Sequence, residues 1–546
     1  MTGQLQTSTR AGQRLDWTYD GQLPVRETSS GIVGGSVSRR YDSDFRIIEV
    51  AVNDAGVGYA YDNDSLLTAA GPVALGRSAT TGQLLTSTTG NVVTSYTYDV
   101  YGAPASMETR VGSTVVFREA LTWDDIGRVS AKDVSVQGTA TRWDYAYDAA
   151  SRLVQTRRDG TAVGAWGYDA NGNRLSADGV TSTFDAQDRQ LTSSVTTFTH
   201  DAFGSRTSMT ATGQTTRYVY DGVGGLLSAT LPDGTSLEYV IDSRGRRVGK
   251  KRNGALEKGW LYDGQLRIIA EVDATGAVTS RFVYGTLSHS PDVMLRAGVT
   301  YRYVHDALGS VRLVVNVSTG QVVQRIDYDS WGVVTSDSSP GFQPFAFAGG
   351  LFDVDTQLTR FGARDYDAAV GRWTSKDPIR LAGGVNVYSF SLCAPTYVFD
   401  VSGLKPLTSA RRKEVESALT RISCVSSYGP YADMLQDMLR AGNIEESEPG
   451  INESLARVRE IGGSIVPAYH SNGKIYLRSS VSGPPLTGTL LHELFHNLNW
   501  RDGQAEGEDN TATSATQRIE DDFIQAESSD THHKYDMAAD ACKCKQ

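Results

Sequence analysis

The sequence is poor in cysteine and in long apolar runs, and each shortage excludes a class of protein. It holds 4 cysteines among 546 residues, so a dense disulfide framework is excluded. No window approaches the roughly 18 consecutive apolar residues of a membrane span. The start of the chain also lacks the basic region and apolar core of a cleaved leader. We therefore expect no membrane span and no signal peptide, so that any export needs another route or a longer parent chain.

Positive charge is also in short supply. Lysine and arginine number 52 against 63 acidic residues, which gives a formal net charge of −11. A protein that coats nucleic acid or an anionic membrane needs a basic patch to neutralise phosphates. We therefore expect no nucleic-acid partner, and the acidic stretches Glu506–Asp509 and Glu520–Asp522 argue specifically against a nuclease near the C-terminus.

Glycine and tyrosine are abundant, with 56 and 26 copies, and much of this excess belongs to one repeat. Its better copies read aromatic-x-Tyr-Asp-x-x-Gly-Arg-Leu, and between Asp148 and Asp263 the aspartates recur at intervals of about 16 to 21 residues. The aspartates of the repeat are Asp20, Asp42, Asp62, Asp99, Asp124, Asp148, Asp169, Asp185, Asp201, Asp221, Asp242, Asp263, Asp306 and Asp329.

The repeat has the pattern of a β-hairpin. Residues before each aspartate alternate between aromatic or β-branched and polar types, which is typical of a half-buried strand. Asp, Asn and Gly then form a tight turn, and a second short strand follows. Each hairpin is too small to bury an apolar face alone, so neighbours must stack. We interpret the aspartates as turn-forming residues; the alternative is a series of ligand sites.

These repeats resemble the YD repeat of the Rhs and teneurin family. The resemblance implies that residues 1–350 are a mainly β shell, a strip of hairpins that spirals into a hollow cocoon. It rests on the number of copies, and it leaves the strand register open where copies are degraded, at residues 65–90 and 285–299.

Residues 351–404 resemble the Rhs-associated core. The match lies in ARDYDAAVGRWTSKDPIRLAGGVNVYSF and in Asp400-Val401-Ser402-Gly403-Leu404, which stands where the family closes with Asp-Pro-x-Gly-Leu. The resemblance implies self-cleavage of the bond between Leu404 and Lys405 by an aspartyl-protease-like pair, Asp377 and Asp400. Of two carboxylates held close together one keeps its proton, which provides an acid and a base for hydrolysis.

Two departures from the core signature bear on this prediction. Arg380 stands where the family has glycine, and Val401 stands where it has proline. Neither removes a carboxylate, but both can alter the turn that presents the bond, so slow or absent cleavage is an open outcome. The alternative is that Asp377 and Asp400 are two more turn aspartates.

Residues 405–546 have a different pattern and are expected to form a small α+β domain. Apolar residues recur at helical spacing in 409–425 and 431–444. The stretch 473–481 reads as a short edge strand, and a helix is expected from Leu486. That helix carries His492-Glu493-Leu494-Phe495-His496, the HExxH pattern. Its histidines share one helical face, where both can bind Zn²⁺, and Glu493 is placed to act as general base.

A zinc peptidase of this type needs a third protein ligand, and several residues are candidates. The tail resembles aspzincins, in which a tyrosine follows the third ligand by three places; His532 and Tyr535 have this spacing, and Tyr535 would then stabilise the oxyanion. His533 is the rival, because adjacent histidines on a helix point about 100° apart and only one can bind. The other candidates are Glu520, Glu527, Asp530 and Asp536. The alternative for His492 and His496 is a buried helix with two incidental histidines.

Together these patterns predict a toxin whose shell encloses a C-terminal zinc metallopeptidase and releases it by self-cleavage after Leu404. The expected partners are a protein substrate in a target cell, a cognate immunity protein implied by the family, and a secretion carrier or chaperone. The protein is then secreted or delivered into a target cell. The alternative is a structural or adhesive YD-repeat surface protein whose C-terminal domain only binds metal.

Overall fold

The structure is a computed structural model, and it describes residues 4–404, 444–447, 468–471 and 474–478. The chain divides into two compact units. One consists of Gln6–Arg40 and Ile47–Pro406, and the other takes Met1–Leu5, Tyr41–Arg46 and Leu407–Gln546. Each unit is described by itself.

The first unit is built on an antiparallel sheet of 33 strands, in which consecutive strands pair as a long meander. In its first half the strands are β1 (Thr7–Arg10), β2 (Gln13–Asp20), β3 (Leu23–Ser30), β4 (Gly35–Tyr41), β5 (Ile47–Val52), β6 (Ala55–Tyr61), β7 (Leu67–Ala70), β8 (Val73–Arg77), β9 (Leu84–Thr89), β10 (Val92–Tyr98), β11 (Pro104–Val111), β12 (Thr114–Trp123), β13 (Val129–Val136), β14 (Thr139–Tyr147), β15 (Leu153–Arg158) and β16 (Thr161–Tyr168). The second half comprises β17 (Arg174–Ala177), β18 (Val180–Phe184), β19 (Gln190–Ser193), β20 (Thr196–His200), β21 (Arg206–Ala211), β22 (Gln214–Tyr220), β23 (Leu226–Thr230), β24 (Ser236–Ile241), β25 (Arg247–Arg252), β26 (Ala255–Asp263), β27 (Arg267–Asp273), β28 (Val278–Val283), β29 (Val293–Arg296), β30 (Val299–His305), β31 (Val311–Asn316), β32 (Val322–Tyr328) and β33 (Val334–Asp337).

The Tyr-Asp repeat forms the turns of this meander, as its sequence predicts. In the copy at Asp148, one side-chain oxygen accepts hydrogen bonds from the backbone N–H groups of Ala150 (2.9 Å) and Arg152 (3.0 Å). The other oxygen accepts from Arg152 Nε at 2.7 Å. Partial burial raises the pKa of Asp148, but the side-chain and backbone hydrogen bonds from Arg152 outweigh burial and leave that pKa below its ordinary value. The aspartate is therefore a turn scaffold.

The arginine of one repeat also joins the tyrosine of the next. The Arg152 guanidinium lies 4.8 Å from the ring centre of Tyr168, and Arg128 lies at the same distance from Tyr147. The Tyr168 hydroxyl donates to the Leu153 carbonyl at 2.6 Å, so it returns to the strand that follows Arg152. In these copies the arginine and the tyrosine therefore tie one hairpin to the next, in addition to the turn made by Asp.

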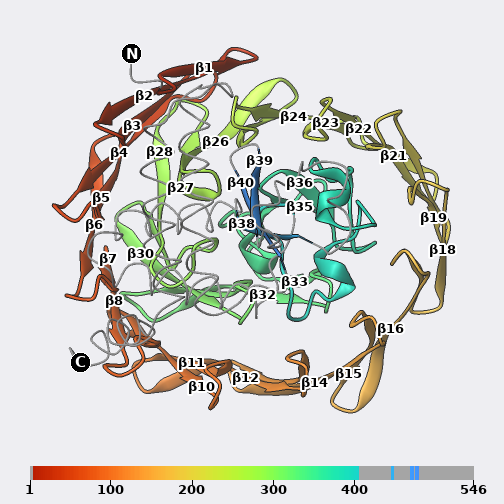
Figure 1. The fold of residues 1–546 in the computed structure, drawn as a ribbon, viewed down its shortest axis with the longest axis horizontal. Coiled ribbons are helices and arrows are strands. Elements are labelled where there is room, and N and C mark those ends of the chain that lie inside the picture. The colour runs from red at the N-terminus through yellow and green to blue at the C-terminus, as the bar shows by residue number, and fades with distance from the viewer. Residues whose placement is uncertain (1–3, 405–443, 448–467, 472–473, 479–546) are drawn as a thin grey trace, which may run out of the picture. The chain divides into compact units, whose positions relative to one another are not determined.

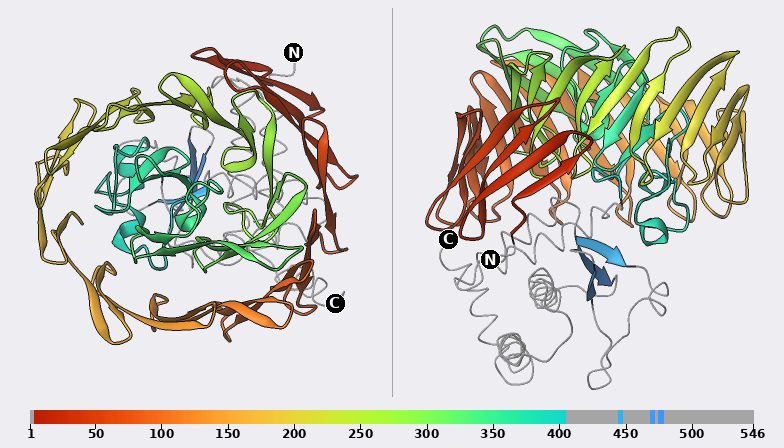
Figure 2. Two further views of the ribbon diagram at one scale, coloured as in Figure 1. Left: turned by 180° about the vertical axis from the view of Figure 1, so that it is seen from behind. Right: turned by 90° about the horizontal axis from the view of Figure 1, so that it is seen from above.

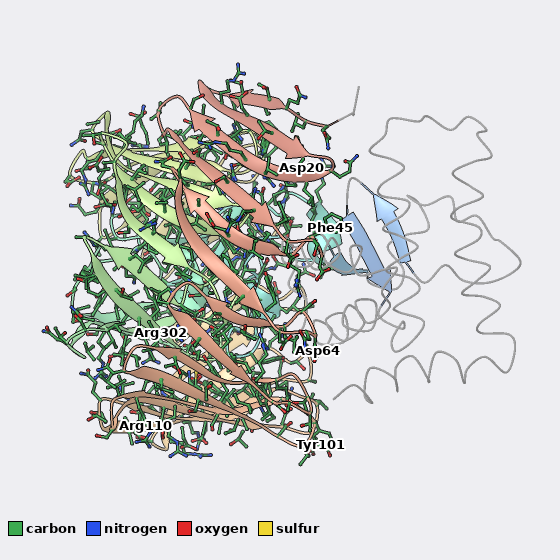
Figure 3. The ribbon with its side chains drawn as sticks, turned by 90° about the vertical axis from the view of Figure 1, so that its left-hand side faces the viewer. Asp20, Phe45, Asp64, Tyr101, Arg110 and Arg302 are labelled. Carbon is green, nitrogen blue, oxygen red and sulfur yellow. The ribbon has the colours of Figure 1, made fainter. Side chains whose placement is uncertain are left out.

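The sheet of this unit curls back on itself, so that its later strands run inside its earlier ones (Figure 1). Figure 2 shows the strands standing side by side around this curl. Buried polar contacts join the two layers: Arg246 Nη2 lies 2.6 Å from Glu27 Oε1, and Arg302 Nη2 donates to Ser87 Oγ at 2.6 Å. Opposite charges buried together keep the layers in one register, because either charge left alone would be costly.

The stretch from 347 to 393 forms a small sheet inside the curl, coloured teal in Figure 1. It consists of β34 (Leu351–Asp353), β35 (Leu358–Phe361), β36 (Arg364–Asp367) and β37 (Arg372–Trp373), with the 3-10 turns η1 (Phe347–Gly349), η2 (Arg380–Gly383) and η3 (Ser391–Cys393). Its apolar centre is aromatic, with the Tyr366 and Phe390 rings stacked 3.8 Å apart. Two buried ion pairs fasten it to the surrounding sheet, Arg247–Asp365 at 2.8 Å and Arg206–Asp367 at 2.6 Å.

In the second unit the structure describes three strands, β38 (Ile444–Ser447), β39 (Ala468–Ser471) and β40 (Lys474–Arg478). The strand predicted at 473–481 is thus present as β40. Its predicted place at a sheet edge is wrong, because β40 pairs with β38 on one side, in parallel, and with β39 on the other, antiparallel. Sequence periodicity identifies a strand but carries no information about its neighbours.

The mainly β class predicted from the repeats is confirmed for the first unit. Both degraded copies form antiparallel pairs. β7 with β8 and β29 with β30 pair without a register shift, whereas the pairing of β8 with β9 shifts between Gly76 and Arg77. In the residues that the structure describes, no helix has the length and apolarity to cross a membrane.

Candidate functional site

The two predicted aspartates, Asp377 and Asp400, lie together in the structure and meet at one arginine. Arg364 Nη2 is 2.7 Å from Asp377 Oδ2 and 3.4 Å from Asp400 Oδ2. All three side chains are almost fully buried. The two carboxylates come from segments on either side of η2 and η3, so the chain reversal that the sequence requires is made by these turns.

Backbone contacts fix Asp377. Its N–H donates to the Val387 carbonyl at 3.0 Å, and its Oδ1 accepts from the N–H of Ile379 at 3.0 Å. The Arg380 N–H closes the turn on the Asp377 carbonyl at 2.9 Å. One oxygen is thereby committed to the turn, and the other faces Arg364.

The closing segment, residues 400–404, lies against the turn between β35 and β36. The N–H of Ala363 donates to the Ser402 carbonyl at 2.8 Å. The approach is so close that a Cβ on Gly362 would stand 2.2 Å from this carbonyl oxygen, and a Cβ on Gly403 would stand 2.3 Å from the Phe361 oxygen. Both glycines also have positive φ, 39° and 65°. Only glycine fits at either position.

Arg364 connects the carboxylates to the predicted scissile bond. Its Nη2 donates to the carbonyl oxygen of Leu404 at 2.9 Å, and its Nε donates to the carbonyl of Gly403. The guanidinium also lies 4.2 Å from the ring centre of Trp373. Burial lowers the pKa of Arg364, while Asp377 and then Asp400 act to raise it. The group keeps its charge, because an arginine is not deprotonated in proteins.

Sequence reasoning missed Arg364. The available signal was its position in Ala363-Arg364-Asp365-Tyr366-Asp367, where arginine precedes the Tyr-Asp turn, whereas the template places it after the turn. The site is therefore a triad of two carboxylates and one cation. The cation, Arg364, contacts the Leu404 carbonyl oxygen, where negative charge develops during hydrolysis.

The departure at Arg380 has a structural meaning. Arg380 has φ 59°, a left-handed conformation that glycine adopts without steric cost, which accounts for glycine at this place in the family signature. Val401 is half-buried within the closing segment. Neither residue prevents the assembly of Asp377, Asp400 and Leu404.

The remaining predicted site residues lie outside the described residues. These are Lys405, the HExxH residues His492, Glu493 and His496, the tail residues Asp530, His532, His533, Tyr535 and Asp536, and the carboxylates Glu520 and Glu527. Among the residues that are described, no group of three His, Cys, Asp or Glu side chains is arranged to hold a metal ion.

Comparison with known proteins relates the chain to two kinds of protein. The family model described as Teneurin YD-shell matches residues 1–394. Teneurin-4 of Mus musculus is 25% identical over 372 residues, which cover 64% of this chain and 13% of that protein. The toxin protein Tse5 of Pseudomonas aeruginosa is 26% identical over 329 residues, which cover 48% of this chain and 25% of Tse5.

Solved structures of similar fold include TcdB2-TccC3-TEV, with a TM-score of 0.57 at 18% identity, covering 73% of this chain and 23% of that one. A Photorhabdus luminescens Tc holotoxin pore with a mutant TccC3 gives a TM-score of 0.54 at 16% identity, covering 72% and 23%. At these identities the likeness concerns the fold. The chain spans about a quarter or less of the length of each of these relatives.

Proposed function

We propose that this chain, which belongs to the Teneurin YD-shell family, is a toxin with a β-shell that encloses residues 405–546. The shell cuts itself after Leu404 and so releases these residues, which act as a zinc peptidase. The toxin assignment draws on the likeness to Tse5, which is named a toxin. The observation that carries the proposal is the contact of Arg364 with Asp377, Asp400 and the Leu404 carbonyl.

The proposed cleavage is a hydrolysis by a carboxylate pair. One aspartate takes a proton from a water molecule, whose oxygen attacks the Leu404 carbonyl carbon. Arg364 stabilises the oxyanion that forms. The other aspartate gives its proton to the Lys405 nitrogen, the C–N bond breaks, and the products are a Leu404 carboxyl group and a Lys405 amine. One carboxyl group must therefore carry a proton at the start of the cycle.

The released part is proposed to be a peptidase because of its HExxH sequence. Zn²⁺ would be held by His492, His496 and a third ligand from the tail. His532 and His533 are preferred for that third ligand over the carboxylates. When bound, the metal activates water and polarises a carbonyl. Glu493 lies next to the first ligand and would accept the proton. The proposal includes a protein substrate in a target cell, a cognate immunity protein, and a secretion carrier or chaperone.

Cleavage is tested by synthesising the full chain in a cell-free system and following the products by mass spectrometry. The wild-type chain should give a fragment that ends at Leu404 and one that begins at Lys405. Asp377→Asn and Asp400→Asn should stay intact, whereas Asp337→Asn, a control in β33 outside the triad, should be cut. A wild-type chain that stays uncut on long incubation would refute self-cleavage.

The peptidase is tested by zinc content and by growth of cells that produce the full chain. We expect one zinc per chain in the wild type and in Glu493→Gln, and less in His492→Ala. Growth should be inhibited by the wild type alone. If the wild type and Glu493→Gln are equally harmful or equally harmless, the peptidase toxin is wrong. Equal harmlessness with bound zinc would favour the alternative, a structural or adhesive protein that only binds metal.

A further inference from the structure

A serine next to the proposed scissile bond has contacts that the family signature does not explain. Ser402 occupies the variable position of the closing pentapeptide, between Asp400 and Leu404. We propose that Ser402 is a positioning residue for the self-cleavage: its hydroxyl fixes the Asp400 carboxylate against the backbone N–H of Leu404. This inference rests on the self-cleavage proposed above.

The hydroxyl of Ser402 bridges the two groups that must stay in register. It donates to Asp400 Oδ1 at 2.9 Å and accepts from the N–H of Leu404 at 3.2 Å. The same N–H also reaches Asp400 Oδ1 at 3.2 Å. These contacts close a small ring of hydrogen bonds. Ser402 is 6% exposed and Asp400 is 2% exposed, so water has little access to replace the hydroxyl.

The backbone of Ser402 is fixed independently of its side chain. Its carbonyl accepts from Ala363 N–H at 2.8 Å, and Gly362 packs directly against that carbonyl. Removal of the hydroxyl therefore leaves the main chain held in place. The effect of the hydroxyl is therefore confined to the directions of the Asp400 carboxylate and of the Leu404 N–H.

Val401 gives a reason why a hydroxyl is needed here. A proline at this position would restrict the backbone φ to about −65° and so limit the rotation of the residues around it. Valine lacks this ring constraint. In this chain the hydrogen bonds of Ser402 restrict the closing segment in place of a proline ring. They leave Asp400 Oδ2 directed at Arg364.

The role predicts a result that a serine which merely fills space would not give. The groups gathered at Asp400 are Arg364 and, through it, Asp377. The hydrogen bonds to Asp400 and to the Leu404 N–H need only a hydroxyl at position 402, so a threonine there should keep most of the cleavage rate and an alanine should not. A side chain that merely filled space would not be replaced in this way by a larger one.

The experiment follows the appearance of the fragment 405–546 during cell-free synthesis of the full chain. Ser402→Ala should cleave about 10-fold to 100-fold more slowly than wild type, the effect of one hydrogen bond to a charged group. Ser402→Thr, which keeps the hydroxyl, should retain most of the rate. Ser391→Ala is the matched control, because its buried Oγ has no hydrogen-bond partner among the described residues.

The outcomes separate this inference from the cleavage itself. If the wild type cleaves and Ser402→Ala cleaves at the same rate, the positioning role is wrong although self-cleavage stands. A Ser402→Thr variant as slow as Ser402→Ala would also overturn it. A wild-type chain that never cleaves would remove self-cleavage and this role together.

Discussion

The guanidinium of Arg364 donates a hydrogen bond to the carbonyl oxygen of Leu404 at 2.9 Å. The same Nη2 atom lies 2.7 Å from Asp377, so one nitrogen joins a carboxylate to the carbonyl of the proposed scissile bond. A buried cation at that oxygen would stabilise negative charge more strongly than it would in water. The contact also holds the end of the closing segment in the interior of the first unit.

Arg364→Lys should nearly abolish cleavage and leave the shell folded. A lysine ammonium is a single point donor and cannot hold Asp377, Gly403 and Leu404 together as the planar guanidinium does. Loss of an oxyanion donor of this type costs on the order of 100-fold to 1,000-fold in rate. The measurement is the rate at which fragment 405–546 appears. Arg296→Lys is the control, because Arg296 contacts the Phe342 carbonyl and ring, away from the site; equal rates in both variants would contradict the prediction.

Gly362→Ala should displace the closing segment and slow cleavage at least 10-fold. The added Cβ would stand 2.2 Å from the Ser402 carbonyl oxygen, which is backbone and cannot rotate away. Gly341→Ala is a matched control, since Gly341 also has positive φ but a Cβ there meets nothing within 4 Å. Both variants carry the cost of a left-handed alanine, about 1 to 2 kcal/mol. Cleavage by Gly362→Ala at the rate of Gly341→Ala would show that the close approach is unimportant.

Asp148→Ala should destabilise the first unit by about 1 to 3 kcal/mol. The substitution leaves the N–H groups of Ala150 and Arg152 without their acceptor and removes the pairing partner of Arg152, which stacks on Tyr168. The measurement is the melting temperature by circular dichroism. Asp133→Ala is the control, because Asp133 is exposed and its carboxylate is paired with the exposed Arg142; its melting temperature should stay near wild type. Equal losses in the two variants would argue against the turn role.

His305→Leu should flatten the loss of stability in mild acid. Burial lowers the pKa of His305 from the ordinary 6.5 to about 3, with Asp292 acting to raise it and Arg302 to lower it further. Because this pKa is depressed in the folded state, the unfolded chain takes up a proton below pH 6.5 that the folded chain does not. The histidine therefore reduces stability as pH falls from 6.5 toward 3, by up to about 1.4 kcal/mol per pH unit.

The prediction for His305 is measured as the free energy of unfolding in urea between pH 6.5 and 4. The slope with pH should be smaller in His305→Leu than in wild type by about one proton. Leucine at this position does not titrate, and it can also change the packing. The test is therefore the difference in slope with pH and not the absolute stability. Identical slopes would show that His305 does not titrate as its burial implies.

Much of the architecture was accessible from the residues alone. Alternating strands and Asp-Gly turns are local features, and the copy at Asp148 folds as its own sequence predicts because its hydrogen bonds span only a few residues. The place of β40 was not predictable, because a strand's neighbours are set by pairing with distant segments. The HExxH motif and the third ligand stay predictions of the sequence, since they lie outside the described residues.

The sequence by itself determined the hairpin repeat and singled out Asp377, Asp400 and Leu404, while the boundary at residues 351–404 stays a prediction. Only the tertiary structure decided that Arg364 stands between the two carboxylates and on the Leu404 carbonyl, and that Ser402 bridges Asp400 to the Leu404 amide. The physical reason is the distance along the chain over which each interaction acts. Turn and strand preferences act between neighbours, whereas Arg364 meets Leu404 only because aromatic packing and two facing glycines bring β36 and the closing segment together.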